Sequence, residues 1–246
     1  MSISWLQRLM GTTVPLTDVQ HERLRNIVSA GQDVPDWSAV GLDGARWVVA
    51  DVESSGLDVW RDELIAIGAV VVSGAAVALN QTHEVVLRQD KVSTEENILI
   101  HRISGRDQQA GIDPVEALLS FFEFVGNSPL VGYHASFDRI MLERACKKYL
   151  GTAIERTWLD LAALAPALVD TEQGSAKTRA AGHGHPLDWW LARYRIEVSV
   201  RHNAAADALG TAQLLGVLIS LAEKQGVANV ESVLECAKDY EWLRRR

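Results

Sequence analysis

The chain has 246 residues, of which 48% are hydrophobic and 23% charged, and its 18 glycines and 6 prolines are ordinary for a globular protein. This composition excludes a disordered, collagen-like or coiled-coil protein and leaves enough apolar residues for a sizeable core. The net charge of −8 argues against a broad basic face that holds long nucleic acid by counterion release, although it is compatible with an enzyme that handles a phosphate-bearing end through bound cations.

Two cysteines are too few for a disulfide scaffold and favour a reducing compartment. The longest apolar run, residues 64–72, is about half as long as a membrane-spanning helix. The first residues interleave apolar and polar side chains, unlike a secretion leader. We therefore expect a cytoplasmic protein that does not associate with membranes.

Residues 1–45 are expected to form an N-terminal extension. Apolar residues recur at helical spacing over residues 17–30, and Gly31 is a candidate stop. The sequence leaves two interpretations open. The segment is either a helix packed on the main domain or an arm that docks a partner.

From residue 46 the pattern changes to strands. Residues 47–52, 64–72 and 75–87 predict a three-stranded meander. Further elements are then expected in this order: a helix at 114–126 with Asp113 and Glu116 forming a capping box, a strand at 130–133, a helix at 137–150, a strand or helix lead-in at 158–161, a mobile loop at 171–185, and helices at 186–194, 204–224 and 229–243. This order predicts an α/β fold, a mixed sheet flanked by helices, over residues 46–224. Residues 225–246 are expected to be a helix packed on or beside that domain.

The first candidate for chemistry is a pair of carboxylates at the end of the first strand. Asp51 and Glu53 are two residues apart, so both side chains point to the same face of the sheet. Two like charges at the end of an otherwise apolar strand are costly unless a cation or a proton offsets them. The plainer interpretation is a pair of surface carboxylates.

Three further residues complete the candidate set. Asp138 follows a short apolar strand and opens a helix, where an acidic residue is also favoured by the helix dipole alone. His202 and Asp207 are five residues apart, about 140° on one helix. They share a site only if His202 lies in the loop entering the helix and Asp207 lies in its first turns. The plainer interpretation of His202 is a structural histidine.

Four motifs agree in order and spacing with those of a known family. They are residues 49–58 (VADVESSGLD), 100–104 (IHRIS), 133–138 (YHASFD) and 202–208 (HNAAADA). With these motifs the chain resembles the DEDDh 3′-5′ exonucleases, the group that includes the proofreading epsilon subunit of bacterial DNA polymerase III. The resemblance implies a ribonuclease-H-like, five-stranded mixed sheet.

The resemblance also implies two divalent ions, Mg²⁺ or Mn²⁺, held by Asp51, Glu53, Asp138 and Asp207. Hard cations of this kind prefer oxygen ligands, and a pair of them suits in-line phosphoryl displacement. His202 would be the general base that takes a proton from the attacking water, a role that suits an imidazole near neutral pH.

Substrate contacts carry over from the same motifs. Ser54 stands where the family most often has threonine, near the terminal nucleotide, and Leu57 matches an apolar wedge against the last base. The remaining expected contacts are His101, Ile103, Phe137 and His134, which occupies a position where asparagine is common. Core packing is the plainer interpretation of the three apolar residues in this set.

The implied function is removal of nucleotides, as 5′-monophosphates, from the 3′ end of single-stranded or frayed DNA. An exoribonuclease is an alternative, because the choice depends on whether the pocket accepts a 2′-hydroxyl. A non-catalytic subunit that binds a polymerase or a nucleic-acid end is a second alternative, and an endonuclease is a third. A DNA polymerase or another protein is the partner expected for the N-terminal extension.

Overall fold

The computed structural model describes residues 15–173, 184–198 and 201–244. The N-terminal fourteen residues and most of the loop expected at 171–185 lie outside these ranges. The expected loop begins too early, because its first three residues belong to a helix that ends at Gln173.

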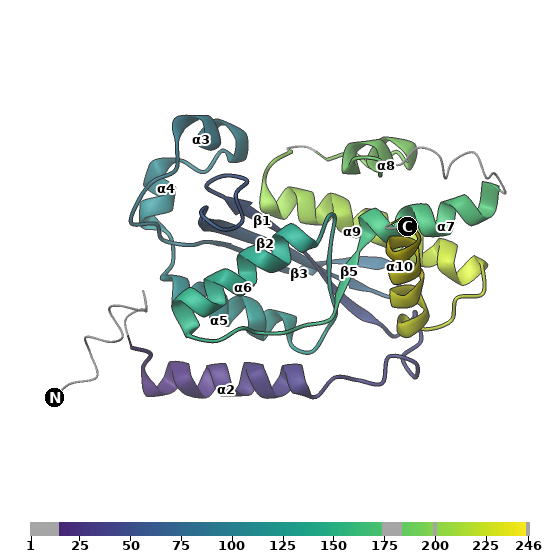
Figure 1. Ribbon diagram of the computed structural model, residues 1–246, viewed down its shortest axis with the longest axis horizontal. Coiled ribbons are helices and arrows are strands. Elements are labelled where there is room, and N and C mark those ends of the chain that lie inside the picture. Colours follow the sequence, from purple (N-terminus) through teal and green to yellow (C-terminus); the bar gives the residue numbers. More distant parts are fainter. Residues whose placement is uncertain (1–14, 174–183, 199–200, 245–246) are drawn as a thin grey trace.

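A five-stranded mixed sheet forms the centre of the molecule (Figure 1). Its strands are β1 (Arg46–Ser54), β2 (Leu64–Ser73), β3 (Ala76–Val86), β4 (Leu130–Gly132) and β5 (Trp158–Asp160), in the spatial order β3-β2-β1-β4-β5. The central strand β1 pairs antiparallel with β2 and parallel with β4, which in turn pairs parallel with β5. The predicted α/β class with a mixed five-stranded sheet is therefore confirmed.

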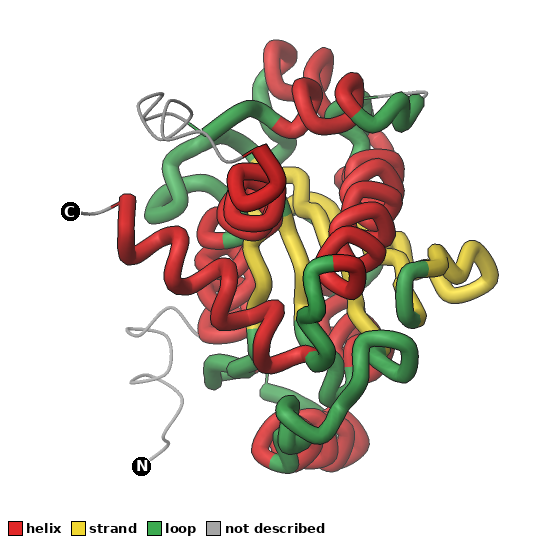
Figure 2. The backbone as a smooth tube through the Cα atoms, turned by 90° about the vertical axis from the view of Figure 1, so that its right-hand side faces the viewer, coloured by secondary structure: helices red, strands yellow, loops and turns green. Residues whose placement is uncertain are grey.

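Helices cover both faces of this sheet (Figure 2). They are α2 (Asp18–Gln32), α3 (Glu95–His101), α4 (Gly105–Ala110), α5 (Pro114–Val125), α6 (Ser136–Leu150), α7 (Leu161–Gln173), α8 (Leu187–Arg193), α9 (Ala204–Lys224) and α10 (Val230–Arg244). The sequence analysis did not predict α3, α4 or α7. The first two are short and bury few side chains, and α7 continues through Pro166 because its apolar side chains pack into the core.

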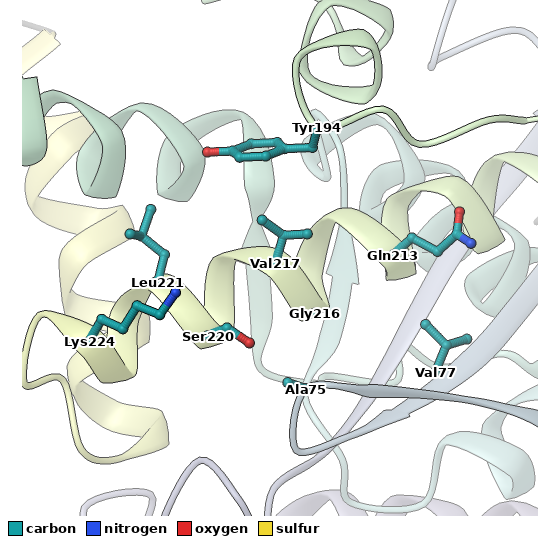
Figure 3. A pocket seen from close by; sticks show the side chains of 9 residues that line it. All are labelled: Ala75, Val77, Tyr194, Gln213, Gly216, Val217, Ser220, Leu221 and Lys224. Atoms are coloured by element: carbon teal, nitrogen blue, oxygen red, sulfur yellow. The ribbon is translucent and has the colours of Figure 1, made fainter.

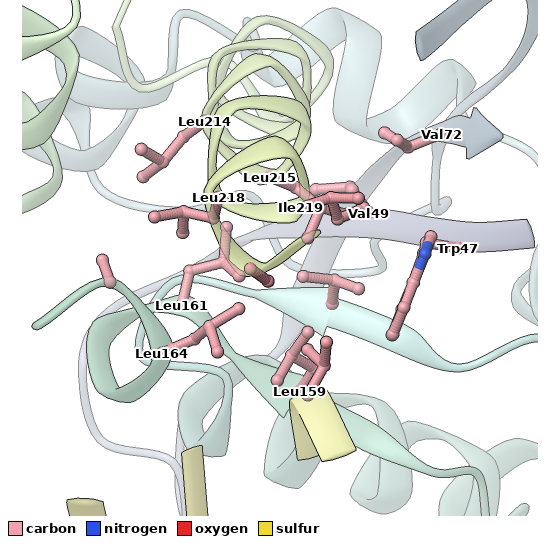
Figure 4. Close-up of a cluster of buried hydrophobic side chains, with 14 of the residues drawn as sticks. Trp47, Val49, Val72, Leu159, Leu161, Leu164, Leu214, Leu215, Leu218 and Ile219 are labelled. Carbon is pink, nitrogen blue, oxygen red and sulfur yellow. The ribbon is translucent and has the colours of Figure 1, made fainter. Parts of the chain in front are cut away.

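Alternate residues of β1 face two separate cores. Trp47 and Val49 pack with α7, α9 and α10 on one face, whereas Val48 and Ala50 pack with α5 and α6 on the other. Figure 4 shows the first core, with α9 lying over the strands. By length and composition α9 could cross a membrane, but most of its apolar stretch is buried here as a core helix.

The terminal helices pack on opposite layers. Arg23 of α2 binds Glu116 and Glu123 of α5 at 2.6 and 2.7 Å, while α10 packs on α7. The expected capping box of α5 forms only in part. Asp113 accepts from the Val115 amide at 3.0 Å, but the Glu116 carboxylate is engaged by α2. The described part of the extension thus packs on the main domain.

Candidate active site

The carboxylates of β1 face α9. Asp51 and Glu53 continue the face of Trp47 and Val49, as the two-residue spacing predicts. The strand pairing places Asp51 opposite Gly68 of β2 and Glu53 opposite Ala66, and the pairing shifts immediately after Glu53. Such an irregularity bends the strand end and turns the chain away from the sheet. Both carboxylates therefore lie where β1 leaves the core.

The first turn of α9 supplies a third carboxylate to the same place. Oxygen atoms of Asp51, Glu53 and Asp207 all lie within 4.8 Å of one another. Asn203 caps the helix by accepting from the Ala206 amide at 3.0 Å, so the helix begins directly after the His202 loop. As the sequence analysis required, Asp207 lies in the first turn and is buried.

Asp138 reaches the cluster from the other layer. It lies in the first turn of α6, which follows β4, and its Oδ1 accepts from the Val52 amide of β1 at 3.1 Å. This buried hydrogen bond fixes the carboxylate against the strand that carries Asp51 and Glu53. The structure thus brings together the four acidic residues that the sequence analysis selected.

The negative charges of the cluster are unfavourable unless a proton or a cation offsets them. Burial, followed by the charges of Asp138, Glu53 and Asp207, raises the pKa of Asp51 well above its ordinary value. Burial likewise raises the pKa of Glu53 to about 7 and that of Asp138 to about 8. Carboxylates with raised pKa values, whether buried as Asp138 is or partly buried as Asp51 and Glu53 are, are typical of functional sites and are the groups that a bound cation would stabilise in their charged form.

One protein cation already lies at the edge of this cluster. The Arg201 guanidinium binds Asp207 and also Asp188 of α8, the latter at 2.6 Å. Its charge opposes the upward pKa shifts of Asp51 and Glu53.

His202 projects from the loop ahead of α9. Its side chain is exposed, and its amide donates to Oδ2 of Asp207 at 2.9 Å. The backbone φ of His202 is 59°, in the left-handed region that few residues other than glycine adopt. This turn keeps the amide on the carboxylate and leaves the imidazole on the solvent side of the cluster.

The residues expected to contact substrate differ in how far their side chains are exposed. Leu57 is exposed, Ser54 and Ile103 are partly buried, and the Ser54 hydroxyl donates to the Gly56 carbonyl at 2.6 Å. Phe137 is partly buried and packs against the core of α5 and α6.

The two histidines of that set differ in exposure. His101 is buried, and its Nδ1 accepts from the Ile103 amide at 3.0 Å, so its ring holds the segment after α3 in place. His134 is exposed with φ of 58°, and its amide donates to Asp160 at 2.9 Å. Asp160 therefore fixes the turn between β4 and α6.

Gly68 is a site residue that the sequence analysis missed. A Cβ atom at this position would lie 2.3 Å from the Ala204 carbonyl carbon and the Ala205 amide nitrogen. The backbone of α9 can approach β2 this closely only because residue 68 has no side chain. A glycine inside the β-branched run 64–72 was the available signal.

Replacing Gly68 by alanine is expected to impair both the fold and the site. The added methyl group must displace the first turn of α9. This turn is the element that holds Asp207 close to Asp51. We expect the free energy of unfolding to fall by about 1–3 kcal/mol, and any activity that depends on the cluster to fall about a hundredfold. Thermal unfolding and nuclease assays measure the two effects.

Gly44 offers the matched control, because a Cβ atom there would meet its nearest atom at 3.9 Å. The Gly44→Ala variant should behave as the wild type does. Wild-type stability and activity in Gly68→Ala would show that the close approach of α9 is dispensable.

A separate hollow of about 500 Å³ lies along α9 (Figure 3). Its lining includes Tyr194, Gln213 and Lys224, together with residues of the turn between β2 and β3. None of the four acidic residues lines it. The carboxylate cluster is thus distinct from this hollow.

Comparison with known proteins agrees with the geometry. A model of the exonuclease family RNase_T matches residues 48–215, a stretch that contains the four acidic residues and His202. The chain belongs to this exonuclease family. The assignment to the 3′-5′ exonucleases made from the motifs is thereby confirmed, whereas the likeness to the epsilon subunit is only distant.

Curated relatives of this exonuclease chain are DNA polymerases III of the PolC type. The chain is 27% identical to that of Thermotoga maritima over 92% of its own length, and 29% identical to that of Thermotoga petrophila over 80%. It spans only 15% and 14% of the length of these two relatives.

Solved structures share the fold of the exonuclease chain. E. coli exonuclease I in complex with a dA16 oligonucleotide superposes with a TM-score of 0.60 at 15% identity, covering 73% of this chain and 42% of that one. Exonuclease X in complex with 5′ overhanging duplex DNA superposes with a TM-score of 0.57 at 19% identity, covering 78% of this chain and 99% of that one.

Proposed function

We propose that this protein is a metal-dependent 3′-5′ exonuclease that hydrolyses the terminal phosphodiester bond of single-stranded or frayed DNA and releases nucleoside 5′-monophosphates. The observation that carries the proposal is the convergence of Asp51, Glu53, Asp138 and Asp207, from three elements, beside an exposed His202. Membership of the exonuclease family supports the same reaction class.

The donor set fits two divalent ions such as Mg²⁺ or Mn²⁺. All four ligand groups are carboxylates, which hard cations prefer. Burial and mutual repulsion raise the pKa values of Asp51, Glu53 and Asp138, and the charge of Arg201 opposes this only in part for Asp51 and Glu53, which supports a site that takes up cations. When bound, such ions would neutralise charge on the phosphate that reacts and on the leaving oxygen.

In this proposal the protein residues have separate roles. The four carboxylates hold the ions, and His202 accepts the proton of the attacking water. The imidazole reaches solvent, and the hydrogen bond from its amide to Asp207 fixes the backbone from which it projects. We propose that Ser54, at the end of β1, and Leu57, in the loop that follows, contact the terminal nucleotide.

DNA is the proposed substrate for two reasons. The relatives at 27% and 29% identity are DNA polymerases, and structures that share this fold were solved with DNA. The net charge of −8 fits an enzyme that holds only the end of a strand, so we propose weak processivity for the isolated protein. We also propose a DNA polymerase as a protein partner.

A gel time course on matched 5′-labelled single-stranded DNA and RNA tests the proposed function. With Mg²⁺ or Mn²⁺ we expect a ladder that shortens from the 3′ end on DNA, slower cleavage of RNA, and no cleavage with EDTA. The opposite preference would identify an exoribonuclease, and cleavage of circular DNA would identify an endonuclease. Absence of cleavage with either metal would contradict the proposal and favour a binding subunit.

A further inference from the structure

Two large apolar side chains project into solvent from the loop between β1 and β2. The side chain of Leu57 is 89% exposed and that of Trp60 is 74% exposed. The adjoining helix α3 adds exposed Leu99 and Ile100. Exposed apolar side chains gathered in this way are typical of a binding surface.

The loop that carries Trp60 is held rigid by its own polar groups. One oxygen of the Asp62 carboxylate accepts from the Ser55 hydroxyl at 3.0 Å, and the other accepts from the Asp58 amide at 2.8 Å. The Asp58 carboxylate in turn accepts from the amide of Trp60 at 2.9 Å. The backbone at the tryptophan is therefore fixed.

Neighbouring elements brace the same loop. The Arg144 guanidinium of α6 donates to the carbonyl groups of Val59 and Asp62. Gly56 makes room for this arrangement, because a Cβ atom there would lie 2.4 Å from the Asp62 carboxylate. A loop braced this fully while two large apolar side chains stay in water is preorganised for a ligand, since little conformational entropy is left to lose on binding.

The position of the loop indicates which ligand it would bind. Its two ends are joined by hydrogen bonds between Ser55 and Glu63, directly after the strand that carries Asp51 and Glu53. The Asn97 side chain of α3 also donates to the Ser54 carbonyl at 2.9 Å. The loop and α3 are thus both attached to the end of the strand that carries two of the carboxylates.

The charge of the protein decides how a strand can be held there. With a net charge of −8 and a carboxylate cluster at the site, long-range attraction to phosphates is weak. Stacking of a base on an aromatic ring contributes about 1–3 kcal/mol per base and needs no positive charge. The exposed ring of Trp60, on the loop that follows the strand with Asp51 and Glu53, can supply that contribution.

We propose that Trp60 is a stacking platform for a base of the single-stranded DNA upstream of the terminal nucleotide, whose own base meets Leu57. This inference rests on the proposed exonuclease function and extends it, because it makes binding depend on strand length. Stacking on one ring also makes the contact independent of base sequence.

Binding assays in the His202→Ala background, in which hydrolysis is expected to be slow, test this inference. A 5′-fluorescein thymidine oligonucleotide of about ten residues and the mononucleotide dTMP are titrated in Mg²⁺ against Trp60→Ala. We expect affinity for the oligonucleotide to fall about 5- to 150-fold and affinity for dTMP to stay unchanged. The loss should be equal at about 50 and about 200 mM salt, since stacking releases no counterions.

Two further variants serve as controls. Trp60→Phe keeps an aromatic face and should recover most of the affinity. Trp242→Ala removes another exposed tryptophan, 53% exposed on α10, and should bind as the parent does. Unchanged oligonucleotide binding by Trp60→Ala, or an equal loss of dTMP binding, would overturn the stacking role.

The outcomes also separate this inference from the proposed function. If the wild type produces the 3′-5′ ladder while Trp60→Ala binds DNA normally, only the role of Trp60 fails. If the wild type cleaves no DNA and the parent binds none, both proposals fail.

Discussion

Replacing Asp51 by asparagine is expected to abolish nuclease activity while making the metal-free protein more tolerant of alkaline pH. Asp51 lies at the centre of the cluster, and the charges of Asp138, Glu53 and Asp207 all act on it. Removing its charge deletes a ligand group, so we expect activity to fall by at least about a hundredfold. Added Mg²⁺ or Mn²⁺ should no longer raise the melting temperature.

The stability effect follows from the sign of the pKa shift. A carboxyl whose pKa is raised in the fold contributes stability that is complete below its unfolded pKa, near 4. That contribution is lost as the pH rises toward the pKa that the carboxyl has in the folded protein. For Glu53 and Asp138 the loss extends to about pH 7 and about pH 8.

Melting temperatures of metal-free wild type and Asp51→Asn between pH 5 and pH 8 measure this effect. The wild type should lose more stability over this interval than the variant does, and metal should restore the wild type most strongly at the upper end. An identical pH dependence in both proteins would show that Asp51 carries no buried charge.

Replacing His202 by alanine is expected to slow hydrolysis about 10²- to 10⁴-fold without loss of metal or strand binding. The imidazole is exposed and does not belong to the group of mutually close carboxylates, so under the proposed function it moves a proton and does not hold an ion. Single-turnover rates, metal-induced thermal stabilisation and oligonucleotide affinity together measure this separation.

The left-handed backbone at His202 calls for a matched variant. Alanine is strained at a φ of 59°, whereas asparagine tolerates that region but cannot act as a base near neutral pH. His202→Asn should therefore be as slow as His202→Ala. Recovery of the rate in His202→Asn would assign the histidine a backbone role, and loss of metal stabilisation in either variant would make it a ligand.

Much of the fold could be predicted because apolar periodicity marks elements buried on one face and a short continuous apolar run marks a strand buried on both. The bounds predicted for residues 204–224 match α9, and the run 64–72 matches β2 within one residue. The short helices α3 and α4 carry too few buried residues to produce a helical pattern. The helix α7 is apolar over most of its described surface, so its pattern has no polar side to show a helical period.

The carboxylates of the site could be predicted because their spacing and sequence context are local. The structural partners could not, because they depend on contacts between distant segments. Gly68 matters only through its approach to Ala204, and Arg201 only through Asp188 and Asp207. The importance of Trp60 likewise depends on exposure and on the bracing of its loop, neither of which a single sequence displays.

The carboxylates come from both layers of the molecule, and this has a thermodynamic consequence. Asp138 begins a helix of one core, Asp207 begins a helix of the other, and the strand between them carries Asp51 and Glu53. A partly folded chain with only one layer docked would hold an incomplete ligand set. Ions that bind the complete set would therefore favour the fully assembled chain over every partly folded one. Under the proposed function, the divalent ion concentration would couple the folding of the two layers into a single cooperative transition.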